Sequence, residues 1–247
     1  MSGKTDSGLE SPPDSLHGTV LLHENGPALW PHYIDEKALA GAHRDVGTPI
    51  WMTMYQGRRG GLSGEIITDA MFRYWTAGAP GGTCFMAVDL AISRKTEADE
   101  TAIAVGNVVD GFIVYRYTWH GRIGPKEQEE VIAKVWDFYR PVEVGVEAVA
   151  YQTALIELLE ADHPQIPVVP VTPDRDKLSR FLALARLYEF GRVYHHPSMK
   201  GSATEYQLTH LPNGRHDDIP DAMTYVAEMA GLAGSAIMSG ERPPGFR

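Results

Sequence analysis

The stretch TCFMAVDLAISRKTEADETAIAVGNVVDGFIVYRYTW, residues 83–119, decides the fold. Three apolar runs lie within it, separated by a charged segment and by an Asp-Gly turn: TCFMAVDLA (83–91), TAIAVGNVV (101–109) and GFIVYRYTW (111–119). Short apolar runs that are bounded by turn residues predict strands, and an Asp-Gly pair between two of them predicts a hairpin. The stretch therefore predicts three successive antiparallel strands.

The chain after this meander alternates between helical and extended patterns. PKEQEEVIAKVWDFYRP (125–141) has apolar residues at helical spacing between two prolines, which predicts a helix. The patterns that follow predict a strand (142–149), a helix (154–162), a fifth strand (166–171), a helix ended by Gly191 (177–191), a short extended piece RVYHH (192–196) and a last helix (218–234). Together they predict an α/β fold with a mixed five-stranded sheet flanked by helices.

Composition shifts divide the chain into three parts. The first 18 residues are rich in Ser, Gly, Pro and Asp and read as a disordered lead, whereas residues 35–45 favour a short helix. Glycine-rich breaks follow at 55–64 and at 77–82. The boundaries predicted are an N-terminal tail and linker at 1–80, a folded domain at 81–233 and a flexible C-terminal tail at 234–247.

The overall composition is that of a soluble globular protein, with 43% hydrophobic and 22% charged residues in 247. No apolar run of about 18 residues and no signal-peptide pattern is present, so we expect no membrane partner and an intracellular location. The single cysteine, Cys84, excludes an internal disulfide and a cysteine zinc cage. The net charge of -10 argues against coating of nucleic acid by bulk electrostatics, but an acidic metal site is compatible with it.

Acidic residues fall at the ends of predicted strands and at the start of the last helix. Asp89 ends the first strand and Glu147 ends the fourth, so both project from one edge if these strands are neighbours. The segment RHDDIPDA (215–222) adds Asp217, Asp218 and Asp221, and the last two share one helical face. Each acid alone has an ordinary explanation as a turn or capping residue, but their joint placement favours one acidic pocket.

Such a pocket has a chemical use. Like charges at close range repel, and bound cations remove this penalty. Cleavage of a phosphodiester requires an activated water and a stabilised leaving oxygen, which two divalent ions about 3.5 to 4 Å apart supply. Mg²⁺ prefers oxygen ligands of the kind that carboxylates offer. The acids therefore predict a two-metal site for Mg²⁺ or Mn²⁺.

Four segments carry a resemblance to a known family: FMAVDLAISRKTEADETAI, VGVEAVAYQTALIELL, VTPDRDKLSRFLAL with FGRVYHH, and HDDIPDAMTY. They resemble the nuclease domain of the large terminase subunit of tailed bacteriophages over residues 82–230. Residues 29–67 look like the family's segment that joins the packaging ATPase to the nuclease. The resemblance implies a ribonuclease H-like fold and a metal-dependent endonuclease that cuts concatemeric double-stranded viral DNA in the host cytoplasm.

The resemblance also implies roles for residues and partners. It puts Asp89 in the first acidic position, Glu147 in the second and the pair Asp217 and Asp218 in the third, with Asp221 as a helper. Asp99 lies where some relatives carry an auxiliary acid. The implied partners are double-stranded DNA, a terminase ATPase region, the small terminase subunit and the portal protein.

One departure from the family concerns ATP. The chain has no GxxxxGK[ST] phosphate loop. The segment SGKT at residues 2–5 matches only the last residues of this motif, so we expect no ATP hydrolysis. Two alternatives to a terminase nuclease stay open. One is a RuvC-type Holliday-junction resolvase, which shares the acidic arrangement, and the other is a non-catalytic module that docks on the packaging motor.

Basic residues and histidines complete the candidates. Lys177 and Arg180 are three apart and either contact a phosphate backbone from one helix face or form a solvated face. Arg58 and Arg59 are candidates for contact with DNA or with a partner protein, although their glycine-rich surroundings favour an ordinary flexible loop. His216 is an auxiliary candidate that assists proton transfer or holds a carboxylate. A zinc site is disfavoured because no two histidines have i, i+4 spacing.

Overall fold

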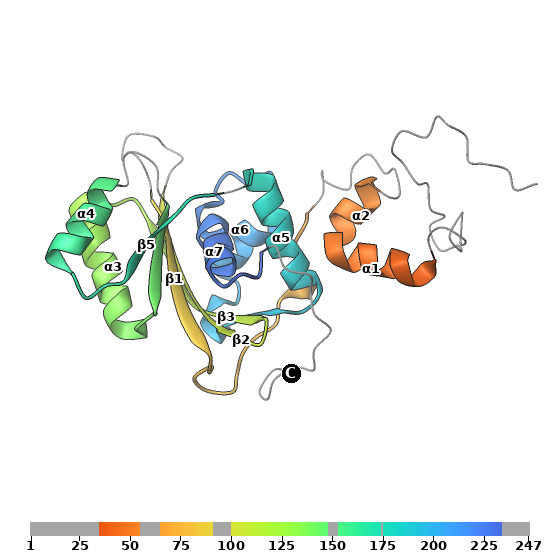
Figure 1. The fold of residues 1–247 in the computed structure, drawn as a ribbon, viewed down its shortest axis with the longest axis horizontal. Coiled ribbons are helices and arrows are strands. Elements are labelled where there is room, and N and C mark those ends of the chain that lie inside the picture. Colours follow the sequence, from red (N-terminus) through yellow and green to blue (C-terminus); the bar gives the residue numbers. More distant parts are fainter. Residues whose placement is uncertain (1–34, 55–64, 91–99, 148–152, 174, 234–247) are drawn as a thin grey trace, which may run out of the picture.

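The computed structural model describes residues 35–54, 65–90, 100–147, 153–173 and 175–233. In this part of the chain a six-stranded mixed sheet forms the centre of the fold, with the order β5-β4-β1-β2-β3-β6 (Figure 1). The strands are β1 (Thr83–Asp89), β2 (Thr101–Val109), β3 (Phe112–Gly121), β4 (Glu143–Glu147), β5 (Val168–Val171) and β6 (Val193–His195). The first three form an antiparallel meander, while β4 pairs parallel with β1, β5 with β4 and β6 with β3.

The predicted α/β class and the three-stranded meander are confirmed, but the predicted number of strands is wrong. The sequence predicts RVYHH (192–196) as an extended piece outside the sheet, whereas β6 pairs with Ile113–Tyr115 and adds a sixth strand. All three residues of β6 are buried. A strand of three residues is too short for an alternating pattern, so its place in the sheet depends on tertiary packing.

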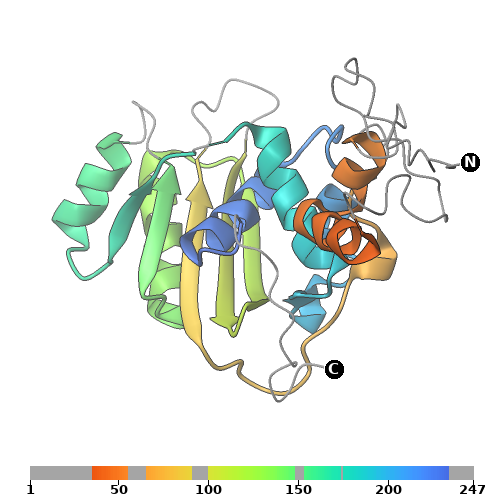
Figure 2. The same ribbon diagram turned by 45° about the vertical axis from the view of Figure 1, so that its right-hand side comes forward.

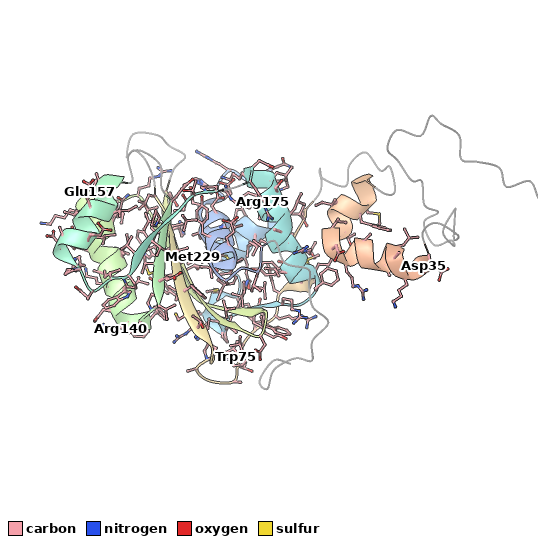
Figure 3. The ribbon with its side chains drawn as sticks, viewed as in Figure 1. Asp35, Trp75, Arg140, Glu157, Arg175 and Met229 are labelled. Atoms are coloured by element: carbon pink, nitrogen blue, oxygen red, sulfur yellow. The ribbon has the colours of Figure 1, made fainter. Side chains whose placement is uncertain are left out.

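Helices cover both faces of the sheet (Figure 1). Helices α3 (Pro125–Tyr139) and α4 (Thr153–Asp162) lie on one side, and α5 (Lys177–Glu189), α6 (Ala203–Thr209) and α7 (Asp218–Met229) lie on the other. Figure 3 shows the same two layers of helices: the labelled Arg140 and Glu157 lie on the α3 side of the sheet, and Met229 lies on the α7 side. None of the helices in the described ranges is both long enough and apolar enough to cross a membrane.

The two faces of the sheet carry side chains of different size. Met86, Val88 and Val146 are buried in the cluster that includes α3 and α4. On the opposite face, β1 and β2 contribute the small residues Ala87 and Ala104 to the cluster that includes α7, and β3 contributes the larger Ile113 and Tyr115. A side chain added at Gly145 would come within 2.4 Å of the Met229 sulfur. Small residues on this face therefore let α7 lie directly on β1 and β2, close to the strand ends.

The N-terminal helices pack against the end of α5 (Figure 2). Helix α1 (Glu36–Val46) confirms the predicted short helix and ends at Gly47, whose φ of 76° is accessible to glycine. A second helix that the sequence analysis did not identify, α2 (Thr48–Met54), begins immediately after it. The Thr48 backbone N–H donates to Glu189 Oε2 at 2.9 Å, which joins α2 to the C-terminal end of α5.

Candidate functional site

The two strand-end acids lie at one edge of the sheet. Asp89 is the last residue of β1 and Glu147 is the last residue of β4. These strands are parallel neighbours in which Val88 pairs with Val146, so the next residue of each strand is an acid. The condition under which both acids project from one edge, that the first and fourth strands are neighbours, is therefore met.

Helix α7 brings further acids to the same edge. Its first turn contains Asp218 and Asp221, and the helix packs on β1 and β2. Burial raises the pKa of Asp89 well above its usual range, and the nearby carboxylates of Asp221, Glu147 and Asp218 raise this pKa further. Asp89 of β1 is thus close enough to Glu147 of β4 and to Asp218 and Asp221 of α7 for its charge to be affected by theirs.

Two cations from α5 hold one side of this acidic group. The Lys177 Nζ lies 2.6 Å from Asp221 Oδ2 and 2.8 Å from Asp217 Oδ1, and Arg180 Nη2 donates to Asp221 Oδ1 at 2.7 Å. Burial lowers the pKa of Lys177, but the carboxylates of Asp221 and Asp217 outweigh burial and raise it to about 12. Both oxygens of Asp221 are therefore bound by cationic side chains.

The two basic candidates differ in exposure. Only 8% of the Arg180 side chain is exposed, and its guanidinium also lies over the Tyr225 ring. The Lys177 side chain is 47% exposed and reaches the acids from the surface. In this arrangement Arg180 faces the interior, while Lys177 is the cation that a ligand approaching the acids would meet.

One carboxylate oxygen of Asp218 has no hydrogen-bond partner among the described residues. Its Oδ2 and the Nδ1 of His216 are buried atoms for which the described residues offer no hydrogen bond, and the two atoms are 3.9 Å apart. Burial raises the pKa of Asp218, a backbone N–H of Glu100 lowers it, and Asp217 raises it again. A buried carboxylate oxygen without a partner costs about 1–3 kcal/mol or more, which a bound cation would offset.

The carboxylate oxygens at this edge are therefore of the kind that a hard divalent cation prefers. Their side chains do not, however, surround a common point. Among the residues that the structure describes, no group of three or more His, Cys, Asp or Glu side chains is arranged to hold a metal ion. Asp89 and Glu147 lie at the same edge of the sheet, whereas the carboxylates of Asp217 and Asp221 point toward Lys177. Direct metal ligation by these residues stays a prediction.

Three predicted site residues, Asp99, Arg58 and Arg59, lie outside the described residues. In contrast, the structure adds a residue that the sequence analysis did not identify. The Gln207 Oε1 accepts a hydrogen bond from the Ile219 backbone N–H at the start of α7. No pattern in the sequence marks this glutamine, because the contact depends on how α6 packs against α7.

A family model and solved structures show what the chain resembles. The family model described as terminase RNaseH-like domain matches residues 86–230. A search of curated protein sequences found no match.

Two similar solved structures come from one phage protein. The large terminase of the thermophilic bacteriophage D6E matches with a TM-score of 0.60 and 14% identity, over 81% of this chain and 52% of that chain. A crystal form of the same protein in complex with ADP gives a TM-score of 0.59 and 12% identity, over 78% and 52% of the two chains. The chain thus spans about half the length of the D6E protein. The family match and this likeness confirm the ribonuclease H-like fold.

Proposed function

Because the chain belongs to the terminase RNaseH-like domain family, we propose that it is the nuclease region of a large terminase subunit. In this role it cleaves double-stranded viral DNA during genome packaging, with Mg²⁺ or Mn²⁺ as cofactor. The observation that supports this proposal best is the convergence of Asp89, Glu147 and Asp218 at one edge of the sheet, where Asp218 Oδ2 has no hydrogen-bond partner in the described part of the chain.

The proposal gives each side chain a role. Asp89, Glu147 and Asp218 would hold the divalent ions, with Asp217 beside them. When bound, such ions supply the positive charge that stabilises the departing oxygen of a phosphodiester. The backbone N–H of Glu100 and the His216 ring lie next to Asp218 and orient its carboxylate. We infer that Lys177, which is half exposed, contacts a DNA phosphate.

Isosteric substitution of the strand-end acids tests the proposal. Asp89→Asn and Glu147→Gln keep the size of the side chain but remove the charge that a divalent ion requires. We expect Mg²⁺- or Mn²⁺-dependent nicking of plasmid DNA to fall by more than the roughly 10–100-fold that loss of an outer-shell partner costs. The measurement is supercoiled plasmid cleavage over a range of Mn²⁺ concentrations.

The matched control is Asp137→Asn, because Asp137 is an exposed acid in α3 and its loss changes the net charge by the same amount. This variant should cleave like the wild type. Full activity in Asp89→Asn or in Glu147→Gln would overturn the proposal. Parallel assays on linear duplex and on four-way junctions separate a terminase nuclease from a junction resolvase.

The partners of the longer protein are part of the same proposal. The chain spans about half the length of the D6E terminase, so a packaging ATPase region, the small terminase subunit and the portal are proposed partners. We propose the cytoplasm of the infected host cell as the place of action, because packaging takes place there.

A further inference from the structure

The N-terminus of α7 is capped by another element rather than by its own acids. Asp217 occupies the N-cap position but makes no side-chain capping hydrogen bond, and its Oδ1 faces Lys177 instead. The cap comes from α6, where Gln207 Oε1 accepts the Ile219 N–H at 3.0 Å. Gln207 is buried, with 4% of its surface exposed, so water does not compete for this bond.

The sequence at the start of α7 makes the Ile219 N–H the donor that is available to a capping side chain. The first N–H groups of a helix have no partner within the helix, and an N-cap Asp ordinarily accepts from the second or third residue. In α7 the third residue is Pro220, which has no N–H, and the Asp221 N–H bonds to the Asp217 carbonyl at 2.9 Å. Ile219 is therefore the donor for which Asp217 and Gln207 would compete.

We propose that Gln207 is a positioning residue of the acidic site, because by capping α7 it releases Asp217 from capping. Asp217 Oδ1 then binds Lys177, and the first turn of α7 presents Asp218 near Asp89. This inference rests on the proposed function, since the consequence of releasing Asp217 is the binding of a divalent cation. An Asp217 that turned inward to cap Ile219 would lose its place beside Lys177.

Helix α6 is held firmly enough to fix the position of Gln207. A seven-residue helix is not stable alone, so its position depends on tertiary contacts. Glu205 Oε1 accepts from the Tyr74 hydroxyl at 2.8 Å and lies 3.0 Å from His195 Nδ1, while Glu205 Oε2 accepts the Gly201 N–H at 2.7 Å. The hydroxyls of Thr204 and Thr118 are 2.6 Å apart. These bonds tie α6 to β3, to β6 and to the segment before β1.

The test compares Gln207→Leu with Gln207→Glu. Leucine has a similar size but no acceptor, so the Ile219 N–H is left to Asp217; glutamate keeps the acceptor. We expect the half-saturating Mn²⁺ concentration for plasmid nicking to rise about tenfold or more in Gln207→Leu. Mn²⁺ binding measured by calorimetry should weaken in parallel. Gln207→Glu should need no more Mn²⁺ than the wild type.

A control variant separates positioning from general loss of stability. Ile132→Val removes one methyl group from the core on the opposite face of the sheet and should lower the melting temperature, as loss of a cap does. Its Mn²⁺ requirement should stay at the wild-type value. The inference is overturned if Gln207→Leu has an unchanged Mn²⁺ requirement, or if Ile132→Val shows the same rise.

A second variant decides the matter if Gln207→Leu does not fold. Pro220→Ala adds an N–H at the third position of α7, which gives Asp217 a capping partner that Gln207 does not occupy. We expect the Mn²⁺ requirement to rise in this variant also, and an unchanged value would overturn the inference. A wild-type protein that binds Mn²⁺ without cleaving DNA would overturn the proposed function, and the calorimetric titrations would still test Gln207. A wild-type protein that binds no Mn²⁺ would overturn both.

Discussion

At the scale of single residues, the acids of the site differ in what their carboxylates contact. One acid is bound by cationic side chains and joins two helices, whereas another has a carboxylate oxygen that is available to a ligand. Asp221 has both oxygens bound by cations, while Asp218 has one buried oxygen to which no described residue donates a hydrogen bond. The exposed fraction of the side chain is 6% for Asp221 and 8% for Arg180, so this pair is a buried ion pair with a large desolvation cost. We infer that the Arg180–Asp221 pair fixes α5 against α7.

Removal of Arg180 tests this anchor. Arg180→Met keeps most of the packing but leaves Asp221 Oδ1 without its cation, and we expect the free energy of unfolding to fall by about 3 kcal/mol. The comparison variant is Arg140→Met, because Arg140 pairs with Asp137 on the surface and an exposed pair contributes about 0–1 kcal/mol. Urea unfolding of both variants gives the measurement. Equal losses in the two would contradict a buried anchor.

The sequence predicted which acids meet, but it did not predict their partners. Asp89 and Glu147 end apolar strands, and such positions converge once the strand order is known. Arg180 reaches Asp221 across 41 residues, and Gln207 reaches Ile219 across 12 residues. These contacts depend on the packing of α5 and α6 against α7, for which periodicity and composition carry no signal.

At the scale of elements, the same limit explains β6 and α2. Five strands could be predicted because their apolar runs are long enough to show a pattern, whereas β6 has three residues and is a strand only because β3 pairs with it. Gly47 and Pro49 follow the predicted helix at 35–45, and both residue types can end a helix. Gly47 does end it, but proline is tolerated in a first turn, so Pro49 lies at the start of α2.

The attachment of α6 predicts how stability depends on pH. Burial raises the pKa of Glu205, but hydrogen bonds with His195, the Gly201 N–H and Tyr74 outweigh burial and lower it below its usual 4.5. A carboxylate whose pKa is lower in the folded state stabilises the fold above pH 4.5, and this contribution is lost as the pH falls through the folded pKa. Glu205→Gln should therefore be less stable than wild type at pH 7.

The difference between the two proteins should become smaller below pH 4.5, where the wild-type carboxylate takes up a proton. Urea unfolding of wild type and Glu205→Gln at a series of pH values measures this difference directly. A difference that stays constant from pH 7 to the acid limit would show that the charge of Glu205 does not hold α6.

At the scale of the whole molecule, the segment before β1 belongs to the folded core. Ile66 and Ile67 are 3% and 0% exposed and lie in the hydrophobic cluster of α5 and α7. Tyr74 forms a bridge with His195, and its hydroxyl donates to Glu205. The sequence placed this segment in the linker because glycine-rich breaks lie on both sides of it. We propose that the stable folded unit begins near residue 65 rather than at residue 81.

Two truncated chains test where this unit begins. A chain of residues 65–247 keeps the buried isoleucines and is the reference, because it lacks α1 and α2 just as the shorter chain does. A chain of residues 81–247 loses Ile66 and Ile67, each of which contributes about 1.5–3 kcal/mol when fully buried, and it removes the Tyr74 donor of Glu205. We expect its free energy of unfolding to be about 3–6 kcal/mol lower in urea unfolding. If the two truncated chains had the same free energy of unfolding, the burial of residues 65–80 would contribute nothing to the stability of the fold. These residues would then belong to the linker.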